Sequence, residues 1–370
     1  MIAPMQGLAP PAALHLPEKW SLSGANREIG LPLTVKVIII SIFLPEGLSF
    51  YVAGLRLTVT RLIFLVVTPV LVVRLSRMLG AGRYRFVLSD LLVPVAGVWM
   101  FVAPAQMDGA GMALTHGGPD VLEFGVGYMA TRVLLSEHGQ ALSFANLLCF
   151  TIIASGLGMI MAFTSAGVLS FVLGTALLVY SRILAGVSLR WFALIAAVAA
   201  GIATVFIVSN NPWTIIARYL IFDPESGYDR INQWHDVSLI LSQSPWFGLG
   251  FPEFWTGEAL PASIDNNWLY YAVAYGIPGS ILIGFSTLGA TSLPTSGPGV
   301  NLTAAECKLG TTLSIVLCLI VLVGFTVYIW GTDRILCGLL MGVRAHLGAL
   351  GRLPGSMPGD RPKPRSLLNW

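Results

Sequence analysis

Apolar runs long enough to cross a bilayer recur along this chain, and they restrict its fold more than any other feature. A helix needs about 20 apolar residues to span roughly 30 Å of hydrocarbon. Soluble domains carry roughly 25% charged residues, whereas this chain has 11% and is 55% hydrophobic. The series of short alternating segments that a membrane barrel requires is missing from the sequence. The sequence therefore predicts an all-α fold, a polytopic membrane helix bundle.

The spacing of the runs predicts about ten transmembrane helices. The expected spans are 31–44, 58–73, 86–104, 121–135, 141–163, 166–180, 191–208, 266–290, 309–330 and 335–350. The organisation that follows is a cytoplasmic tail at 1–30, spans 1 to 7 within 31–208, a long polar segment at 209–265, C-terminal spans within 266–350 and a tail at 351–370. Short connectors are expected at 48–57, 105–120 and 291–308.

Basic residues give the chain a predicted orientation. The densest basic cluster, Arg74, Arg77, Arg83 and Arg85, marks the cytoplasmic side by the positive-inside rule. Counting spans from there places Arg61 near the outer face and delivers 209–265 to the outside. The run 335–350 has two interpretations: as a span it returns the basic C-terminal tail to the cytoplasm, and as an interfacial helix it leaves that tail outside.

The polar segment 209–265 is the candidate functional region. It holds seven acidic residues and only two basic ones, Arg218 and Arg230. A guanidinium binds phosphate in a bidentate manner and stays charged at any relevant pH. The two arginines are therefore candidates for a diphosphate clamp, although an arginine–aspartate pair that stabilises the loop would also explain each of them.

Residues 227–242 are predicted to form an amphipathic helix that Ser226 caps and that Pro245 ends. Such a helix can lie in the membrane interface and present a headgroup with Arg230 and His235, or it can simply pack. Trp234 suits stacking on a sugar ring or an interfacial belt. His235 and Asp265 are candidates for proton transfer, with ordinary hydrogen bonding as the alternative. The sequence shows no metal-ligand spacing and no cofactor-binding motif.

Several short motifs in a fixed order resemble the O-antigen polymerase and ligase superfamily, and most closely its Wzy-type exopolysaccharide repeat-unit polymerases. They are an arginine in the outer loop (Arg218 or Arg230), Trp234, the run Ser244-Pro245-Trp246-Phe247-Gly248-Leu249-Gly250, Asn266 or Asn267, and Gly276-Ile277-Pro278-Gly279. The stretches around Arg61, and around Glu123 and Arg132, are also similar to the family.

The resemblance implies a multi-pass enzyme of the bacterial inner membrane. It would join oligosaccharide repeat units carried on a polyprenyl diphosphate, such as undecaprenyl diphosphate, without a metal or other cofactor. A polysaccharide co-polymerase that regulates chain length would be a partner. The implied catalytic residues are Arg218, Arg230, His235 and Asp265, and the implied substrate-binding residues are Arg61, Trp234, Asn266 and Asn267.

The sequence departs from the family at two places. Ligases of the superfamily carry a histidine directly before the asparagine that starts the span, whereas Asp265 stands here, which favours a polymerase. Many relatives carry Ser-Arg-Gly where this chain has Ser165-Ala166-Gly167. Two alternatives stay open: a ligase that transfers a finished glycan to another acceptor, and a transporter, which would need ionisable residues deep inside several spans.

Overall fold

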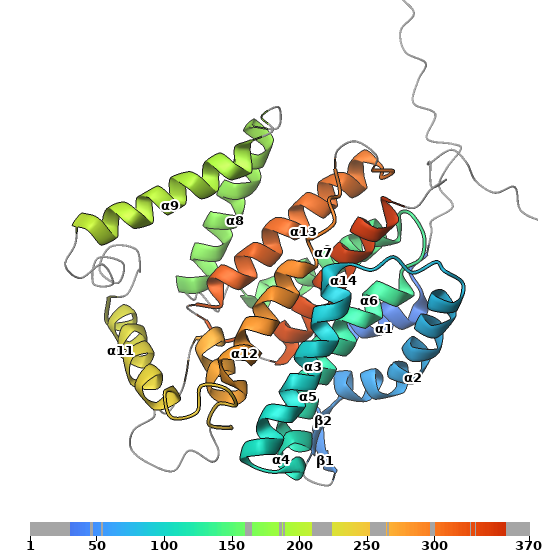
Figure 1. The fold of residues 1–370 in the computed structure, drawn as a ribbon. Helices are drawn as coiled ribbons and strands as arrows, with labels where there is room; N and C mark the ends of the chain where they lie inside the picture. Colours follow the sequence, from blue (N-terminus) through green and yellow to red (C-terminus); the bar gives the residue numbers. More distant parts are fainter. Residues whose placement is uncertain are drawn as a thin grey trace, which may run out of the picture.

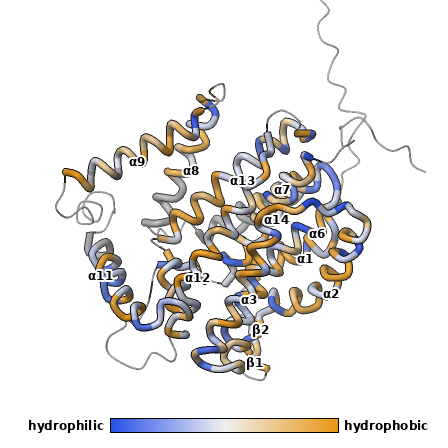
Figure 2. Tube along the Cα trace, viewed as in Figure 1, coloured by the Kyte–Doolittle hydropathy of each residue, from blue (hydrophilic) through white to orange (hydrophobic). Residues whose placement is uncertain are grey.

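Apolar helices make up most of the structure, a computed structural model that describes residues 30–352 apart from 45–46, 53–54, 160–164, 185–186, 188, 209–223, 252–263, 265, 297–299, 326 and 330. Within this range, five helices are long and apolar enough to cross a membrane: α2 (Val59–Gly80), α3 (Leu88–Met107), α9 (Arg190–Val208), α12 (Asn267–Gly289) and α13 (Ala304–Val323). Hydrophobic residues run along them in Figure 2. An all-α membrane protein is thus confirmed in outline, while the number of ten spans stays a prediction.

Other helices coincide with predicted spans but differ from them in length. They are α1 (Leu33–Ile42), α7 (Gln140–Met159), α8 (Ser165–Ile183) and α14 (Gly331–Leu350). At a rise of about 1.5 Å per residue, α1 with its 10 residues is too short to cross the hydrocarbon by itself. In Figure 1, α8 and α9 project from the side of the bundle, and α8 contacts α13.

The segment predicted as a short connector at 48–57 forms a β-hairpin, which is a correction to the purely helical prediction. Strand β1 (Ser49–Val52) pairs antiparallel with β2 (Leu55–Thr58), and Tyr51 lies opposite Arg56. The hairpin ends where α2 begins, because the Thr58 side chain accepts a hydrogen bond from the Arg61 backbone N–H and caps that helix. This arrangement brings Arg56 and Arg61 to the same end of the bundle.

The segment predicted as a loop at 105–120 is helical from Ala110 onward, so that prediction was wrong. A continuous helical run is built from α4 (Ala110–Met112), η1 (Ala113–Gly117), α5 (Gly118–Val121), η2 (Leu122–Val126) and α6 (Gly127–Leu134), where η1 and η2 are π-helical turns. Its glycines and proline suggest a loop by propensity. Packing decides otherwise, because Gly117 lies so close to the Met100 carbonyl on α3 that a Cβ would collide with it.

Helix α14 lies at the centre of the bundle and packs along α6 (Figure 1). Small residues permit this approach, since a Cβ on Gly338 would come within 2.6 Å of the Phe124 carbonyl oxygen. The Thr131 hydroxyl also donates to the Leu339 carbonyl across the contact, at 2.8 Å. Of the two interpretations of 335–350, the interfacial helix does not fit this burial. The span stays a prediction.

Helix α11 (Pro224–Leu241) lies within the long polar segment and packs against α12. The predicted amphipathic helix is confirmed, and Val237 and Leu241 are buried on its inner face. Its start was predicted wrongly: the helix begins at Pro224, so Ser226 lies inside it and is not its N-cap. Proline is favoured in the first turn because its missing N–H needs no partner there.

Candidate functional site

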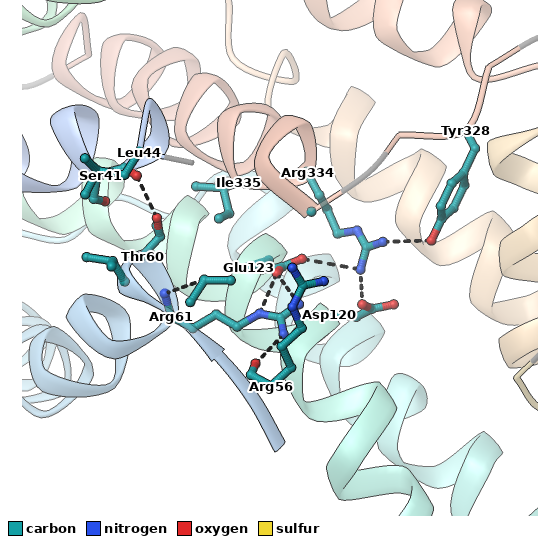
Figure 3. A pocket seen from close by; sticks show the side chains of 13 residues that line it. Ser41, Leu44, Arg56, Thr60, Arg61, Asp120, Glu123, Tyr328, Arg334 and Ile335 are labelled. Carbon is teal, nitrogen blue, oxygen red and sulfur yellow. Dashed lines mark hydrogen bonds and ion pairs between the residues drawn. The ribbon is translucent and has the colours of Figure 1, made fainter. Parts of the chain in front are cut away.

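A polar cavity of about 200 Å³ opens at the end of the bundle where α2 and α14 begin (Figure 3). Its walls come from the end of α1, the hairpin, the first turns of α2 and α14, and the α5–η2 region. The charged or hydroxyl-bearing residues that line it are Ser41, Arg56, Thr58, Thr60, Arg61, Asp120, Glu123, Tyr328 and Arg334. Segments far apart in the sequence therefore supply one concentrated polar site.

Arg61 is anchored by the carboxylate of Glu123 on η2. Its Nε donates to Glu123 Oε1 at 2.8 Å, and its Nη2 lies 2.6 Å from the same oxygen. Its Nη1 donates to the Arg56 carbonyl at 2.7 Å, which ties α2 to the hairpin. Arg61 was predicted to lie near the outer face and to bind substrate, and the structure places it in the wall of the cavity.

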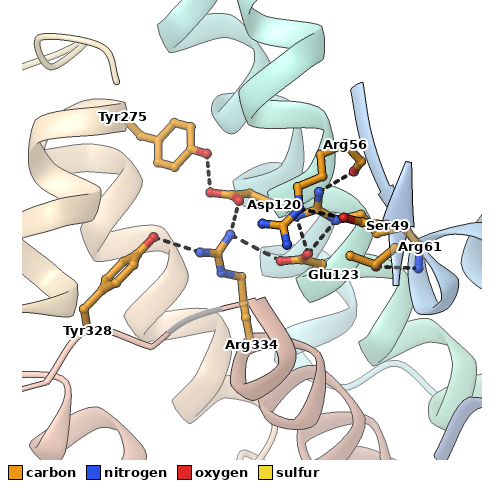
Figure 4. A network of polar contacts seen from close by, with 9 residues as sticks. Ser49, Arg56, Arg61, Asp120, Glu123, Tyr275, Tyr328 and Arg334 are labelled. Carbon is orange, nitrogen blue, oxygen red and sulfur yellow. Dashed lines mark hydrogen bonds and ion pairs between the residues drawn. The ribbon is translucent and has the colours of Figure 1, made fainter. Parts of the chain in front are cut away.

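Arg334, in the first turn of α14, supplies a further guanidinium to the site, and this one is buried (Figure 4). Its Nη1 forms an ion pair with Asp120 and lies 3.6 Å from Glu123 Oε2. Its Nη2 donates to the Tyr328 hydroxyl at 3.0 Å. The Tyr275 hydroxyl on α12 donates to Asp120 at 2.6 Å and completes the network.

Sequence reasoning did not single out Asp120, Tyr328 or Arg334 as site residues. Asp120 fell in the connector predicted at 105–120. Asp120 and Arg334 could have been found as charged residues in apolar surroundings. In a membrane protein, such residues tend to pair with one another and to mark functional sites.

A second buried polar cluster surrounds Asp90, in the first turn of α3. Arg132 contacts both carboxylate oxygens of Asp90, and the hydroxyls of Tyr84 and Tyr128 donate to Asp90 Oδ1. The Val87 backbone N–H donates to Asp90 Oδ2 at 2.8 Å, which caps α3. Both carboxylate oxygens are therefore fully used, as expected for a structural ion pair.

Two of the family-like motifs form one contact. The loop after α11 docks on the middle of α12, where Leu249 N–H donates to the Val273 carbonyl at 2.6 Å and Ile277 N–H donates to the Pro245 carbonyl at 2.9 Å. Gly276 interrupts the helix there with φ 75° and ψ 168°. A Cβ on Gly276 would collide with the Trp246 carbonyl, and one on Gly248 would collide with the Val273 carbonyl. The two motifs thus fix the end of α11 against α12.

The predicted residues of the polar segment are described only in part. Arg218 and Asp265 lie outside the described residues, and so does the side chain of Arg230 in α11. His235 is exposed on the same helix, and Trp234 is 40% exposed. The Trp234 ring stacks on Phe325 with centroids 6.4 Å apart. Whether these residues act together therefore stays a prediction.

Asn266 and Asn267 are buried, and their side chains bind backbone groups. Asn266 caps α12 by accepting from Leu269 N–H at 2.9 Å, and its amide donates to the Phe325 carbonyl at 2.5 Å. Asn267 Oδ1 accepts from Ile329 N–H at 3.2 Å. Both residues hold the linker 324–330 between α13 and α14 to the start of α12, and their predicted contact with substrate stays a prediction.

The linker 324–330 connects the region of α11 with the cavity. On one side Phe325 lies against Trp234, and on the other Tyr328 contacts Arg334. The Tyr328 ring also packs on Tyr270 of α12, with centroids 4.2 Å apart. The exposed helix and the polar cavity are therefore joined by one short segment.

An apolar groove of about 660 Å³ lies beside α11, between α12 and α13. Its lining includes Trp234 and Leu241 of α11, Trp268, Ile281 and Leu288 of α12, and Val321 of α13, together with Phe325 of the linker. The groove follows α12 from near its first turn to near its last, and its dimensions and lining suit an extended hydrocarbon chain.

These features define a helical, multi-pass membrane protein with a polar site at one end of the bundle and an apolar groove beside it. Residues 150–284 match a family described as O-antigen ligase, which confirms the resemblance to the O-antigen polymerase and ligase superfamily. The match supports a function of the O-antigen ligase or polymerase type. No curated protein and no solved structure matches the chain significantly.

Proposed function

We propose that the protein is a glycosyltransferase that joins polyprenyl-diphosphate-linked oligosaccharide repeat units at the outer face of the bacterial inner membrane. The observation that carries this proposal is the family match, because residues 150–284 include α11, the loop that docks on α12, and most of α12. In the proposed reaction a sugar hydroxyl of one lipid-linked unit attacks the anomeric carbon of another. The bond from that carbon to the diphosphate breaks, and polyprenyl diphosphate leaves with the electron pair.

Arg218 and Arg230 are proposed to stabilise the diphosphate as negative charge develops on it. Preorganised cations are most effective where charge appears in the transition state. His235 and Asp265 are proposed to take the proton of the attacking hydroxyl. The exposure of His235 and Trp234 on α11, one turn after Arg230, supports a role for this helix in holding the substrate.

The apolar groove supports a lipid-linked substrate. It starts beside Trp234, where the proposed headgroup would lie, and continues along α12 to Leu288. Burial of a prenyl chain there stabilises the complex by roughly 25 cal/mol for each Å² of apolar surface removed from water. The groove therefore offers the tail a site beside the polar segment that would bind its diphosphate.

A polymerase is preferred over a ligase because Asp265 stands where ligases of the superfamily carry a histidine. The two activities leave different products in a strain that lacks the gene. Loss of a polymerase leaves single lipid-linked repeat units, whereas loss of a ligase leaves free lipid-linked polymer. A transporter would instead move the glycan into proteoliposomes without forming a glycosidic bond.

Complementation of the deletion strain tests the clamp directly. Arg218→Ala and Arg230→Ala are expected to abolish polymer while the protein still reaches the membrane. Arg77→Ala is the matched control, because Arg77 lies in the last turn of α2, at the opposite end from the cavity, and it should leave polymer length unchanged. Normal polymer amount and length in both clamp variants would refute the proposed role of these arginines.

A further inference from the structure

The reaction proposed above involves none of the residues that line the polar cavity at the start of α2 and α14. We propose that it binds a sugar unit of the lipid-linked glycan through Glu123, Arg334 and Arg56, an inference that rests on the proposed function. Arg56 and Glu123 lie outside residues 150–284, and so does Arg334. The cavity would therefore be a second glycan-binding subsite, separate from α11.

The site holds buried polar atoms that have no hydrogen-bond partner in the part of the chain that the structure describes. The Glu123 side chain is only 4% exposed, yet its Oε2 accepts no hydrogen bond from the described residues. Arg334 Nε, in a side chain that is 5% exposed, likewise lacks an acceptor among them. A buried polar group without a partner costs free energy. A ligand with several hydroxyl groups can donate a hydrogen bond to Glu123 Oε2 and accept one from Arg334 Nε.

A purely structural ion pair would be satisfied within the protein. The Asp90–Arg132 pair at the other end of α3 shows this pattern, because protein groups donate to both oxygens of Asp90. In the Glu123 cluster, Arg61 donates to Oε1, and Oε2 has no hydrogen-bond donor among the described residues. The second oxygen lies 3.6 Å from Arg334 Nη1, close enough for an ion pair but beyond hydrogen-bond range. The difference between the two clusters indicates that the second one is completed by a ligand.

The size and composition of the cavity indicate the ligand class. Its volume of about 200 Å³ is smaller than the roughly 300 Å³ at which pockets for drug-sized molecules begin, so it suits one sugar ring. Three guanidinium groups, two carboxylates and several hydroxyls line it. This mixture of donors and acceptors suits a polyol better than a simple anion, which would meet the repulsion of the carboxylates.

The position of the cavity fits a reaction that brings two glycans together. Tyr328, which contacts Arg334, and Phe325, which contacts Trp234, belong to the same linker 324–330. A glycan held near α11 could therefore extend along this linker and place another sugar in the cavity. The subsite would fix the register of the glycan rather than take part in bond formation.

Binding to the purified, full-length protein in nanodiscs tests this inference. The probe is the pool of lipid-linked repeat units extracted from a strain that lacks the gene, and the readout is the shift that it causes in the melting temperature. Glu123→Gln keeps the volume and the contact with Arg61 but alters the acceptor. Arg56→Ala changes an exposed residue at the rim and should leave the fold intact.

Each variant is expected to raise the apparent Kd for the probe about 10- to 100-fold, as expected for loss of a hydrogen bond to a charged group. Asp90→Asn, the control, should melt earlier but keep its ligand-induced shift. If both cavity variants bind the probe as the wild type does, the inference is wrong. If inorganic pyrophosphate stabilises a variant that lacks Arg218 and Arg230, and Arg56→Ala removes that effect, the cavity is an anion site and the sugar assignment fails.

Activity separates this inference from the proposed function. If the wild type binds the probe through the cavity but forms no polymer from it, the proposed polymerase reaction fails and the binding site remains. If the wild type forms polymer and the cavity variants do so with unchanged KM, the subsite is refuted and the reaction remains. If the cavity variants show a raised KM with a smaller change in kcat, both the sugar subsite and the proposed polymerase reaction are supported.

Discussion

Replacement of Gly276 by alanine tests how the two family-like motifs act together. Gly276 has φ 75° and ψ 168°, a backbone conformation that residues other than glycine rarely adopt. A residue held there costs about 1–3 kcal/mol. A Cβ would also collide with the Trp246 carbonyl, so the loop must move. That movement would break the Leu249–Val273 and Ile277–Pro245 hydrogen bonds, which contribute about 1 kcal/mol each.

The expected loss of stability is therefore about 3–5 kcal/mol, the sum of the backbone strain and the two lost hydrogen bonds. Thermal unfolding of the purified protein, followed by tryptophan fluorescence, should show a lower melting temperature. Gly284→Ala is the matched control in the same helix, because its Cβ would meet the Trp268 ring at an ordinary 3.5 Å. If the two variants melt at the same temperature, the argument that the loop docks at a glycine-only position is wrong.

Two further predictions concern orientation and the structural ion pair. The orientation can be tested with a membrane-impermeant thiol reagent in a cysteine-free background. Applied to intact spheroplasts, it should label Thr58→Cys at the cavity, whereas Arg83→Cys should react only after permeabilisation. The opposite pattern would place the cavity and the polar segment in the cytoplasm. Asp90→Asn should lower the stability of the purified protein by about 3–5 kcal/mol, because it leaves Arg132 buried without its counter-ion; an unchanged melting temperature would show that the pair contributes little.

Most of the helices could be predicted from the sequence, because apolar runs and helix stop signals are local. The span predicted at 266–290 agrees closely with α12, Asn267–Gly289. The prediction failed where packing overrides propensity. The glycine-rich segment before Asp120 is helical because it lies against α3, and α14 is central because small residues let it approach α6.

The candidate site was predictable only in fragments. Arg61 was named from the sequence, and it does line the cavity. Its pairing with Glu123 was not predicted, since Glu123 lies 62 positions away, and neither was the Arg334–Asp120 pair, which joins residues 214 positions apart. No local pattern reports contacts at such separations.

The sequence by itself determined that this protein is a helical membrane protein, because in hydrocarbon a helix satisfies its own backbone hydrogen bonds. It also determined the order of the motifs that relate the chain to O-antigen polymerases and ligases. Only the tertiary structure decided which guanidinium meets which carboxylate, and that Glu123 Oε2 lacks a hydrogen-bond donor among the described residues. Those outcomes depend on how the helices cross, and the crossings are set by side-chain packing between segments distant in the chain.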